Sequence, residues 1–151
     1  MTSWIFQGNP KEFQVDEYLK RKEIYWNLEQ HKKGTSLDDV VYIWRADGNK
    51  PKSGGIVAKG KIVDYPREMQ DDAPELWIPP KPENSLKFGV NIEIEDVRLN
   101  EGGGMLKRED LKTDVFVNDL EILVFPGKTN YRLKKKHSGH INYLWKQKKM
   151  K

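Results

Sequence analysis

Tryptophan side chains are the residues in this chain whose type and number most clearly suggest a chemical task. The 151-residue sequence has five of them, together with six tyrosines and five phenylalanines. Trp4, Trp26, Trp44 and Trp77 fall on or beside expected strands, whereas Trp145 falls on an expected final helix. For any one indole, packing in the core is the ordinary explanation. A domain this small cannot easily hide so many, and a slot walled by indoles suits a flat base, because stacking contributes about 1–3 kcal/mol per base.

The second chemical feature is a basic arm at the end of the chain. All 23 acidic residues lie at or before Glu121, and nine of the 27 basic residues follow it. These nine are Lys128, Arg132, Lys134, Lys135, Lys136, Lys146, Lys148, Lys149 and Lys151. A basic arm on an acidic body favours a polyanionic partner. A solvated lysine face that improves solubility explains the same cluster equally well.

Catalysis has little support. The absence of cysteine excludes disulfides, thiolate zinc sites and thiol nucleophiles, and it favours a cytoplasmic protein. His137 and His140 stand in a Ser-Gly segment without a third ligand at a suitable spacing, so we expect surface histidines and no metal. The pairs Asp38-Asp39 and Asp71-Asp72 lie in turns, where carboxylates cap and solubilise. We therefore expect neither enzyme activity nor a cofactor.

A β-hairpin is the element around which the other parts must be arranged. Its expected strands, 40–46 and 56–63, are rich in β-branched and aromatic residues and flank a long, basic loop of turn residues. Gly54, Gly55 and Gly60 have no Cβ, so another backbone or a flat ligand edge can approach the sheet closely there.

The remaining elements follow from the apolar pattern. We expect strands over 4–7, 24–28 and 88–94, a bulge after Ile94, and helices after Asn9-Pro10, over 108–111 and from Ser138. Five prolines between 66 and 85 predict a long loop without a central strand, and this loop carries Trp77. We see no signal peptide and no membrane span. Residues 1–151 are therefore expected to form one domain with a single core.

Several ordered segments resemble the EVE domain family. They are 3–10 (Ser-Trp-Ile-Phe-Gln-Gly-Asn-Pro), 26–30 (Trp-Asn-Leu-Glu-Gln), 41–46 (Val-Tyr-Ile-Trp-Arg-Ala), 54–60 and 106–114, and together they span nearly the whole chain. The resemblance implies an α+β, PUA-like fold, a bent mixed β-barrel of about five to six strands flanked by short helices. It also implies a relation to the YTH readers of methylated adenine in RNA. EVE domains are thought to recognise modified bases, often modified cytosine in DNA and frequently beside modification-dependent restriction enzymes.

The resemblance carries candidate residues with it. Trp26 resembles the cage tryptophan that follows the first helix in YTH readers, and Asn9 lies near their base-contacting asparagine. Trp77 resembles the second cage wall. Three further residues resemble those that line the same face in EVE domains, namely Ser3, Trp4 and Trp44. Where the family usually has an acidic helix start, this chain has basic residues at 134–136, so its last helix is expected to bind phosphates more strongly or to begin later.

These features together predict a non-enzymatic module that binds DNA or RNA through a modified base. Trp26 and Trp77 hold the base, Asn9 bonds its edge, and the phosphates are held by Arg132, Lys134, Lys135 and Lys136. Two alternatives stay open. One is an enzyme or enzyme subunit of nucleic-acid processing, which requires a metal or carboxylate cluster. The other is an accessory domain of a nuclease or restriction system whose aromatic face docks another protein.

Overall fold

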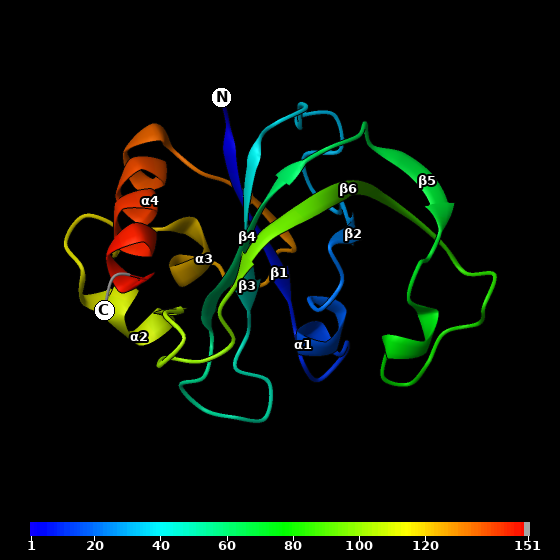
Figure 1. Ribbon diagram of the computed structural model, residues 1–151, viewed down its shortest axis with the longest axis horizontal. Helices are drawn as coiled ribbons and strands as arrows, with labels where there is room; N and C mark the ends of the chain where they lie inside the picture. The colour runs from blue at the N-terminus through cyan, green and yellow to red at the C-terminus, as the bar shows by residue number, and fades with distance from the viewer. Residues whose placement is uncertain (150–151) are drawn as a thin grey trace.

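A curled, mixed β-sheet forms the body of the protein (Figure 1). The computed structural model describes residues 1–149. Its strands are β1 (Ser3–Gly8), β2 (Glu23–Asn27), β3 (Val40–Arg45), β4 (Gly55–Ile62), β5 (Arg67–Gln70), β6 (Leu86–Val97), β7 (Leu106–Lys107) and β8 (Asn130–Arg132). Six of them follow the order β2-β6-β4-β3-β1-β8, while β5 pairs with β6 and β7 with β4. The β1–β3 pair is parallel and the others are antiparallel.

Helices flank this sheet, which confirms the expected α+β class. They are α1 (Val15–Tyr18), the 3-10 turn η1 (Pro74–Leu76), α2 (Arg108–Thr113), α3 (Glu121–Val124) and α4 (Lys135–Lys149). Figure 1 shows α2, α3 and α4 gathered on one side of the sheet, with α1 at its lower edge. Within the described part of the chain, no helix is long and apolar enough to cross a membrane.

The hairpin of β3 and β4 is present as expected, and its glycines explain how other strands join it. Gly55 has a φ of 150°, and a Cβ there would overlap the carbonyl oxygen of Leu106 in β7. A Cβ on Gly60 would overlap the carbonyl oxygen of Glu93 in β6. The close approach predicted from these glycines is therefore made by neighbouring strands.

The bulge predicted after Ile94 is also confirmed. Lys59 pairs with Asp96 and Gly60 pairs with Ile94, so Glu95 is the extra residue on β6. A bulge of this kind bends its strand and increases the local twist. It lies in the long β6 strand, whose first half bends away to pair with β5.

The protein has two apolar clusters, one on each face of the sheet, and the expectation of a single core is wrong in this respect. Successive residues of a strand point to opposite faces. Trp4 and Phe6 therefore pack inside the curl, while Ile5 packs on the helical side. The same alternation sends Trp44 to the helical side, where Trp145 of α4 joins it. Strands β1 and β3 are apolar on both faces, which is why the chain can bury so many indoles.

The helices differ from the expectation at their starts. After Asn9 the chain first makes a turn, in which the Glu12 amide donates to the Asn9 carbonyl at 2.9 Å, and α1 begins only at Val15. The last helix begins at Lys135, so Ser138 lies inside α4 instead of capping it. Lys135 and Lys136 thus open the helix, which begins three residues before the expected start at Ser138.

The proline-rich segment is more ordered than predicted. Strand β5 pairs along the first half of β6, from Arg67 opposite Gly89 to Gln70 opposite Leu86. Pro66 precedes the strand and Pro74 follows it, so neither removes a ladder hydrogen bond. The prolines correctly exclude a central strand here, but they leave room for a short edge strand.

Candidate functional site

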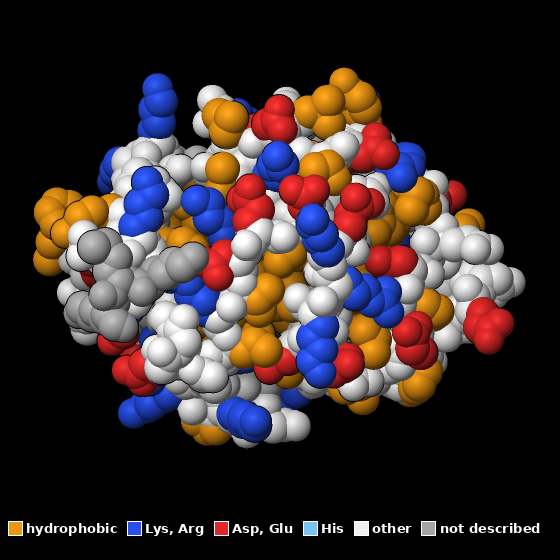
Figure 2. Space-filling model, viewed as in Figure 1, with side chains coloured by type: hydrophobic (Ala, Val, Ile, Leu, Met, Phe, Trp, Pro, Cys, Tyr) orange, Lys and Arg blue, Asp and Glu red, His pale blue; other side chains and the backbone are white. Residues whose placement is uncertain are grey.

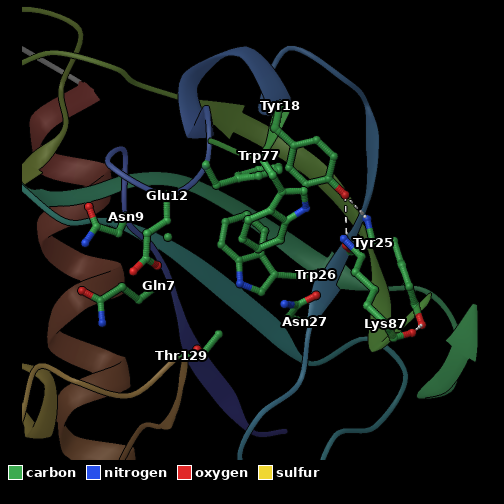
Figure 3. Close-up of a pocket in the computed structure, with 12 residues that line it drawn as sticks. Gln7, Asn9, Glu12, Tyr18, Tyr25, Trp26, Asn27, Trp77, Lys87 and Thr129 are labelled. Atoms are coloured by element: carbon green, nitrogen blue, oxygen red, sulfur yellow. Dashed lines mark hydrogen bonds between the residues drawn. The ribbon is translucent and has the colours of Figure 1, made fainter. Parts of the chain in front are cut away.

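A pocket of about 90 Å³ opens where β1, β2 and β6 meet the segment after η1 (Figure 3). Because a cavity needs roughly 10–15 Å³ to hold one water, this pocket is large enough to hold several waters. Its lining residues are Gln7, Gly8, Asn9, Glu12, Phe13, Tyr18, Tyr25, Trp26, Asn27, Trp77, Lys87 and Thr129. The structure thus places Trp26, Trp77 and Asn9, three of the candidates named from the sequence, on one pocket. Their role in binding stays a prediction.

Four aromatic rings form a continuous wall of this pocket. The ring centroids of Trp26 and Tyr18 lie 6.1 Å apart, those of Tyr18 and Phe13 5.1 Å, and those of Phe13 and Trp77 4.8 Å. All three pairs are inclined, as aromatic pairs prefer. Trp26 is only 5% exposed, whereas Trp77 is half-buried. The two indoles are the ends of an aromatic arc, and Tyr18 and Phe13, which the sequence reasoning did not assign to the site, join them.

Two glycines make room for Trp26. Strand β2 pairs with β6 so that Trp26 stands opposite Val90 and Asn27 opposite Gly89. A Cβ on Gly89 would overlap the Trp26 carbonyl oxygen, and one on Gly8 would lie 3.2 Å from the Trp26 ring. The absence of a side chain at Gly89 thus admits the backbone of Trp26, and its absence at Gly8 of β1 leaves room for the indole.

Trp77 is held by the backbone of the turn that follows β1. The Gln14 amide donates to the Leu76 carbonyl and the Ile78 amide donates to the Glu12 carbonyl, both at 2.9 Å. These bonds form an isolated bridge that places Trp77 beside Phe13. The Lys81 ammonium lies 3.7 Å from the Trp77 ring centroid, within cation–π range.

Asp71 fixes the Trp77 indole from behind. Its Oδ2 accepts a hydrogen bond from Trp77 Nε1 at 2.7 Å, and its Oδ1 accepts one from the Ala73 amide at 2.8 Å. The sequence predicted only a capping role in a turn for this residue. The hydrogen bond from Trp77 Nε1 to Asp71, which positions a side chain of the pocket, could not be predicted from the sequence, because it depends on the orientation of the indole.

A buried cation forms the polar end of the pocket. The Lys87 ammonium lies 3.5 Å from carboxylate oxygens of Asp71 and Asp72 and over the rings of Tyr18 and Tyr25. Burial lowers the pKa of Lys87, and the two neighbouring carboxylates oppose this effect. The Tyr18 hydroxyl donates to Asp72 at 2.8 Å and accepts from the Tyr25 amide at 2.7 Å. Burial raises the pKa of Tyr18, so this phenol stays neutral.

Amide side chains occupy the opposite wall. Asn9 Oδ1 accepts from the Lys11 amide at 3.0 Å, which caps the turn after β1. Gln7 Nε2 donates to the carbonyl oxygens of Pro126 and Lys128. Figure 3 shows Asn9, Glu12 and Gln7 together on one side of the two indoles, and Asn27 below them. Asn27 directly follows Trp26 in a segment singled out from the sequence, but its side chain was not assigned there.

Three candidates, Ser3, Trp4 and Trp44, lie outside the pocket lining, although Trp4 belongs to the same apolar cluster as Trp26. Trp4 is fully buried and its Nε1 donates to Asp39 at 3.0 Å. The Ser3 hydroxyl accepts from the Ser138 hydroxyl at 2.7 Å. Trp44 is 2% exposed and packs on the helical side of the sheet. All three stand on central strands, where both faces are covered by protein.

The basic residues at 132–136 are exposed but do not adjoin the pocket. The Leu133 amide donates to the Ser3 carbonyl, so this segment meets the start of β1, whereas the pocket lies at its end near Gly8. Five residue steps of about 3.3 Å separate the two sites by about 17 Å. Lys136 also pairs with Asp119 at 3.3 Å. The basic residues expected to hold phosphates next to the bound base thus lie at the other end of β1 from the pocket.

Elsewhere on the surface the charges are mixed. Figure 2 shows acidic and basic side chains intermingled over the face that it presents. Such a face creates no strong field of one sign. Lys151 and the side chain of Lys149, which the sequence counted in the basic arm, lie outside the described residues.

The histidines have protein partners. His137 is 3% exposed and lies 2.8 Å from Asp119, so the expectation of a surface histidine is wrong for it. His140 lies 2.9 Å from Asp114. Both stand in α4, with the His137 ring buried and the His140 ring partly exposed. Among residues 1–149, no group of three or more potential metal ligands is found.

Comparisons with known proteins identify the fold. No family model matches the chain, and no curated protein matches it. Solved structures do. A hypothetical protein from Leishmania major has a TM-score of 0.67 at 14% identity, covering 97% of this chain and 96% of that one. The human THYN1 protein, solved in complex with DNA containing 5-methylcytosine, has a TM-score of 0.65 at 12% identity over 96% and 98%.

The DUF55 domain of human thymocyte nuclear protein 1 is similar over 99% of both chains, with a TM-score of 0.62 at 11% identity. At these identities the likeness concerns the fold. It agrees with the EVE resemblance noted in the sequence and with the mixed, curled sheet described above. The chain therefore has the PUA-like fold that this resemblance implied.

Proposed function

We propose that this protein is a non-enzymatic module that binds nucleic acid by holding one modified base in the pocket between Trp26 and Trp77. The observation that carries the proposal is the aromatic arc, with Trp26 and Trp77 at its ends, that lines a pocket of about 90 Å³. The shared fold with the human THYN1 protein, whose structure contains 5-methylcytosine DNA, supports nucleic acid as the partner. Modified cytosine in DNA is the base we favour, and a methylated base in RNA is the alternative within the same proposal.

The physical basis is that the base exchanges its stacking on neighbouring bases for stacking on aromatic side chains of the pocket. A base that leaves a duplex loses a few kcal/mol of pairing and stacking free energy. Contacts with aromatic side chains return about 1–3 kcal/mol per base. Asn9 then bonds the edge of the base. Selectivity for a modification comes from its fit against the rings, since a methyl group adds apolar area without a hydrogen-bonding demand.

The test of this function is a binding titration with the Trp77→Ala variant. We expect wild type to prefer oligonucleotides with 5-methylcytosine over unmodified ones, and Trp77→Ala to bind the modified probe roughly 5- to 150-fold more weakly, because one wall of the stack is lost. Fluorescence anisotropy with methylated, hydroxymethylated and unmodified probes measures both effects. Because Trp77 is half-buried, the variant is expected to stay folded.

Two variants serve as controls. Trp77→Phe keeps an aromatic face and should retain most of the affinity, and Tyr143→Ala removes an aromatic side chain that is 56% exposed and outside the pocket. Equal affinity of wild type and Trp77→Ala for every probe would contradict base binding in this pocket.

The basic segment contributes the phosphate contacts in this proposal. With the duplex axis along β1, the separation of about 17 Å corresponds to about five base pairs, since duplex DNA rises about 3.4 Å per base pair. We therefore expect Lys134, Lys135 and Lys136 to contact phosphates about five base pairs from the bound base. The slope of log K against log salt concentration is negative for such binding. We expect replacement of all three lysines by glutamine to make it less steep by about 2–3, since each phosphate contact contributes about 0.9 to its magnitude. Arg132, exposed on β8, belongs to the same segment.

The length of the probe makes this prediction specific. The effect should appear with a duplex that continues at least about six base pairs past the modified base, and should disappear when the duplex ends after about three. A triple variant of Lys50, Lys52 and Lys112 to glutamine removes the same charge elsewhere on the surface and controls for net charge. The same slope change in both triple variants would contradict a local role for residues 134–136.

An accessory role in a nuclease or restriction system is a second candidate, and one observation favours it. Val115, Phe116 and Tyr143 are 76%, 65% and 56% exposed and lie together beside His140 of α4. Exposed apolar groups of this kind often mark protein contacts. No oligonucleotide affinity in wild type, together with co-purification of a partner that Phe116→Ser abolishes, would favour this role over base recognition.

A further inference from the structure

One polar side chain in the pocket has no partner in the protein. Four buried side-chain atoms of the described residues lack a hydrogen-bond partner: Asn27 Oδ1, Thr35 Oγ1, Asn91 Oδ1 and Arg108 Nε. Of these, Asn27 alone lines the pocket. Native proteins keep few buried acceptors unpaired, because an unpaired acceptor retains its full desolvation cost. The carbonyl oxygen of the Asn27 side chain is therefore best explained by a donor that the pocket receives from outside.

The backbone holds Asn27 in this place. It is the last residue of β2 and pairs with Gly89 of β6. Its main-chain carbonyl accepts from Asn130 Nδ2 at 3.0 Å, and Asn130 is fully buried. Figure 3 shows the side-chain amide below the Trp26 indole, and Asn27 and Lys87 both line the pocket. No hydrogen bond of the Asn27 side chain is found among the described residues, so its amide can turn its oxygen toward the stacking surface and read the edge of a base lying there.

Other acceptors around the pocket already accept a hydrogen bond from the protein, or they are exposed to water and carry no desolvation cost. The carboxylates of Asp71 and Asp72 accept from Trp77, Tyr18 and Lys87. Asn9 Oδ1 accepts from the Lys11 amide. The Glu12 side chain is exposed, so water satisfies its oxygens. Among the lining residues, Asn27 thus presents a buried acceptor with an unmet demand.

We propose that Asn27 Oδ1 accepts a hydrogen bond from the exocyclic amino group of the bound base, so that the pocket selects 4-aminopyrimidines over 4-oxopyrimidines. This inference rests on the proposed function and specifies the class of base. A pyrimidine is tied to its sugar through N1, so it enters the pocket with C4, the ring atom opposite N1, leading. In cytosine and its 5-substituted forms, C4 carries an amino donor. In thymine and uracil it carries a carbonyl acceptor, which would face Oδ1 without a proton between them.

The sharpest probe pair is 5-methylcytosine and thymine in otherwise identical single-stranded oligonucleotides. Both bases carry the 5-methyl group and stack alike, and they differ at C4 and in the proton on N3. Single strands remove the difference in pairing energy between the two bases. We expect wild type to bind the 5-methylcytosine probe roughly 10- to 100-fold more tightly than the thymine probe, the discrimination expected for one good base-edge contact.

Two variants assign this preference to Asn27. Asn27→Leu has a similar size but no acceptor, so it should bind both probes with similar, weak affinity. Asn27→Asp keeps an acceptor oxygen for the amino group and should retain the preference for 5-methylcytosine. Thermal unfolding gives a second readout, because Asn27→Leu removes an unpaired buried acceptor and should melt at or above the wild-type temperature.

The outcomes separate this inference from the proposed function. Wild type that binds neither probe nor any other modified oligonucleotide overturns both. Wild type that binds 5-methylcytosine and thymine equally well overturns the selection by Asn27 and leaves base binding intact. A preference that survives in Asn27→Leu assigns the discrimination to another residue and also overturns the inference.

Discussion

Trp26→Ala is expected to lose selective base binding and to lower the free energy of unfolding by about 3–5 kcal/mol, the usual cost of removing a large buried aromatic side chain. Trp26 packs against Tyr18 and is 5% exposed, so its removal opens a cavity next to the pocket. Binding to a modified oligonucleotide should fall more than about 10-fold, because the inner stacking surface disappears. Denaturant unfolding and anisotropy titration, both on the same preparation, measure the two effects.

Trp26→Phe separates folding from recognition in this experiment. It keeps an aromatic face and part of the volume, so it should recover most of the binding but only part of the stability. If Trp26→Ala stays folded and still distinguishes modified from unmodified probes, the indole is a core residue only and the pocket proposal is wrong.

Gly89→Ala is expected to destabilise the protein by about 3 kcal/mol, although it adds a single methyl group. The added Cβ would overlap the Trp26 carbonyl oxygen, which is a backbone atom and cannot turn away. The β2–β6 pairing must therefore shift, and this moves Trp26 and Asn27 together. Chemical denaturation should show a lower midpoint, and the intrinsic tryptophan fluorescence should change.

Gly139→Ala is the matched control. Gly139 stands in α4, and a Cβ there would meet no heavy atom within 4 Å. Since alanine is preferred over glycine in a helix by roughly 0.5–1 kcal/mol, this variant should be slightly more stable than wild type. Equal stability of the two variants would mean that β2 and β6 do not approach each other as closely at Gly89 as described.

The sequence predicts the strands and their special positions well, because these follow from local rules. The strands expected over 24–28, 56–63 and 88–94, the glycines at 55 and 60, and the phase shift after Ile94 each have one local cause and were confirmed. Helix starts were less predictable. Asn9 could cap a helix or a turn with the same side-chain contact, and tertiary packing decides between them.

The site was predictable only in part, because its walls come from distant segments. Trp77 reaches Phe13 through two backbone hydrogen bonds between segments more than sixty residues apart, and no local pattern encodes that bridge. Alternation also does not say which face of a doubly buried strand carries the pocket, so Trp44 was expected on the wrong face, whereas Trp4 shares the cluster of Trp26 but is fully buried away from the pocket. Asn27 could have been found from its position next to Trp26, in the same quoted segment.

The division of the apolar residues by the sheet has a consequence for how this protein can change. Substitutions at Ile5, Trp44 or Ile141 change the packing against the helices, whereas substitutions at Trp4 or Phe6 change the packing around the aromatic arc. The helical layer can accordingly change in sequence, or adapt to a new neighbour, while the opposite layer keeps the packing around the pocket. Because the two clusters are separated by the sheet, a substitution that alters one of them leaves the packing of the other largely unchanged.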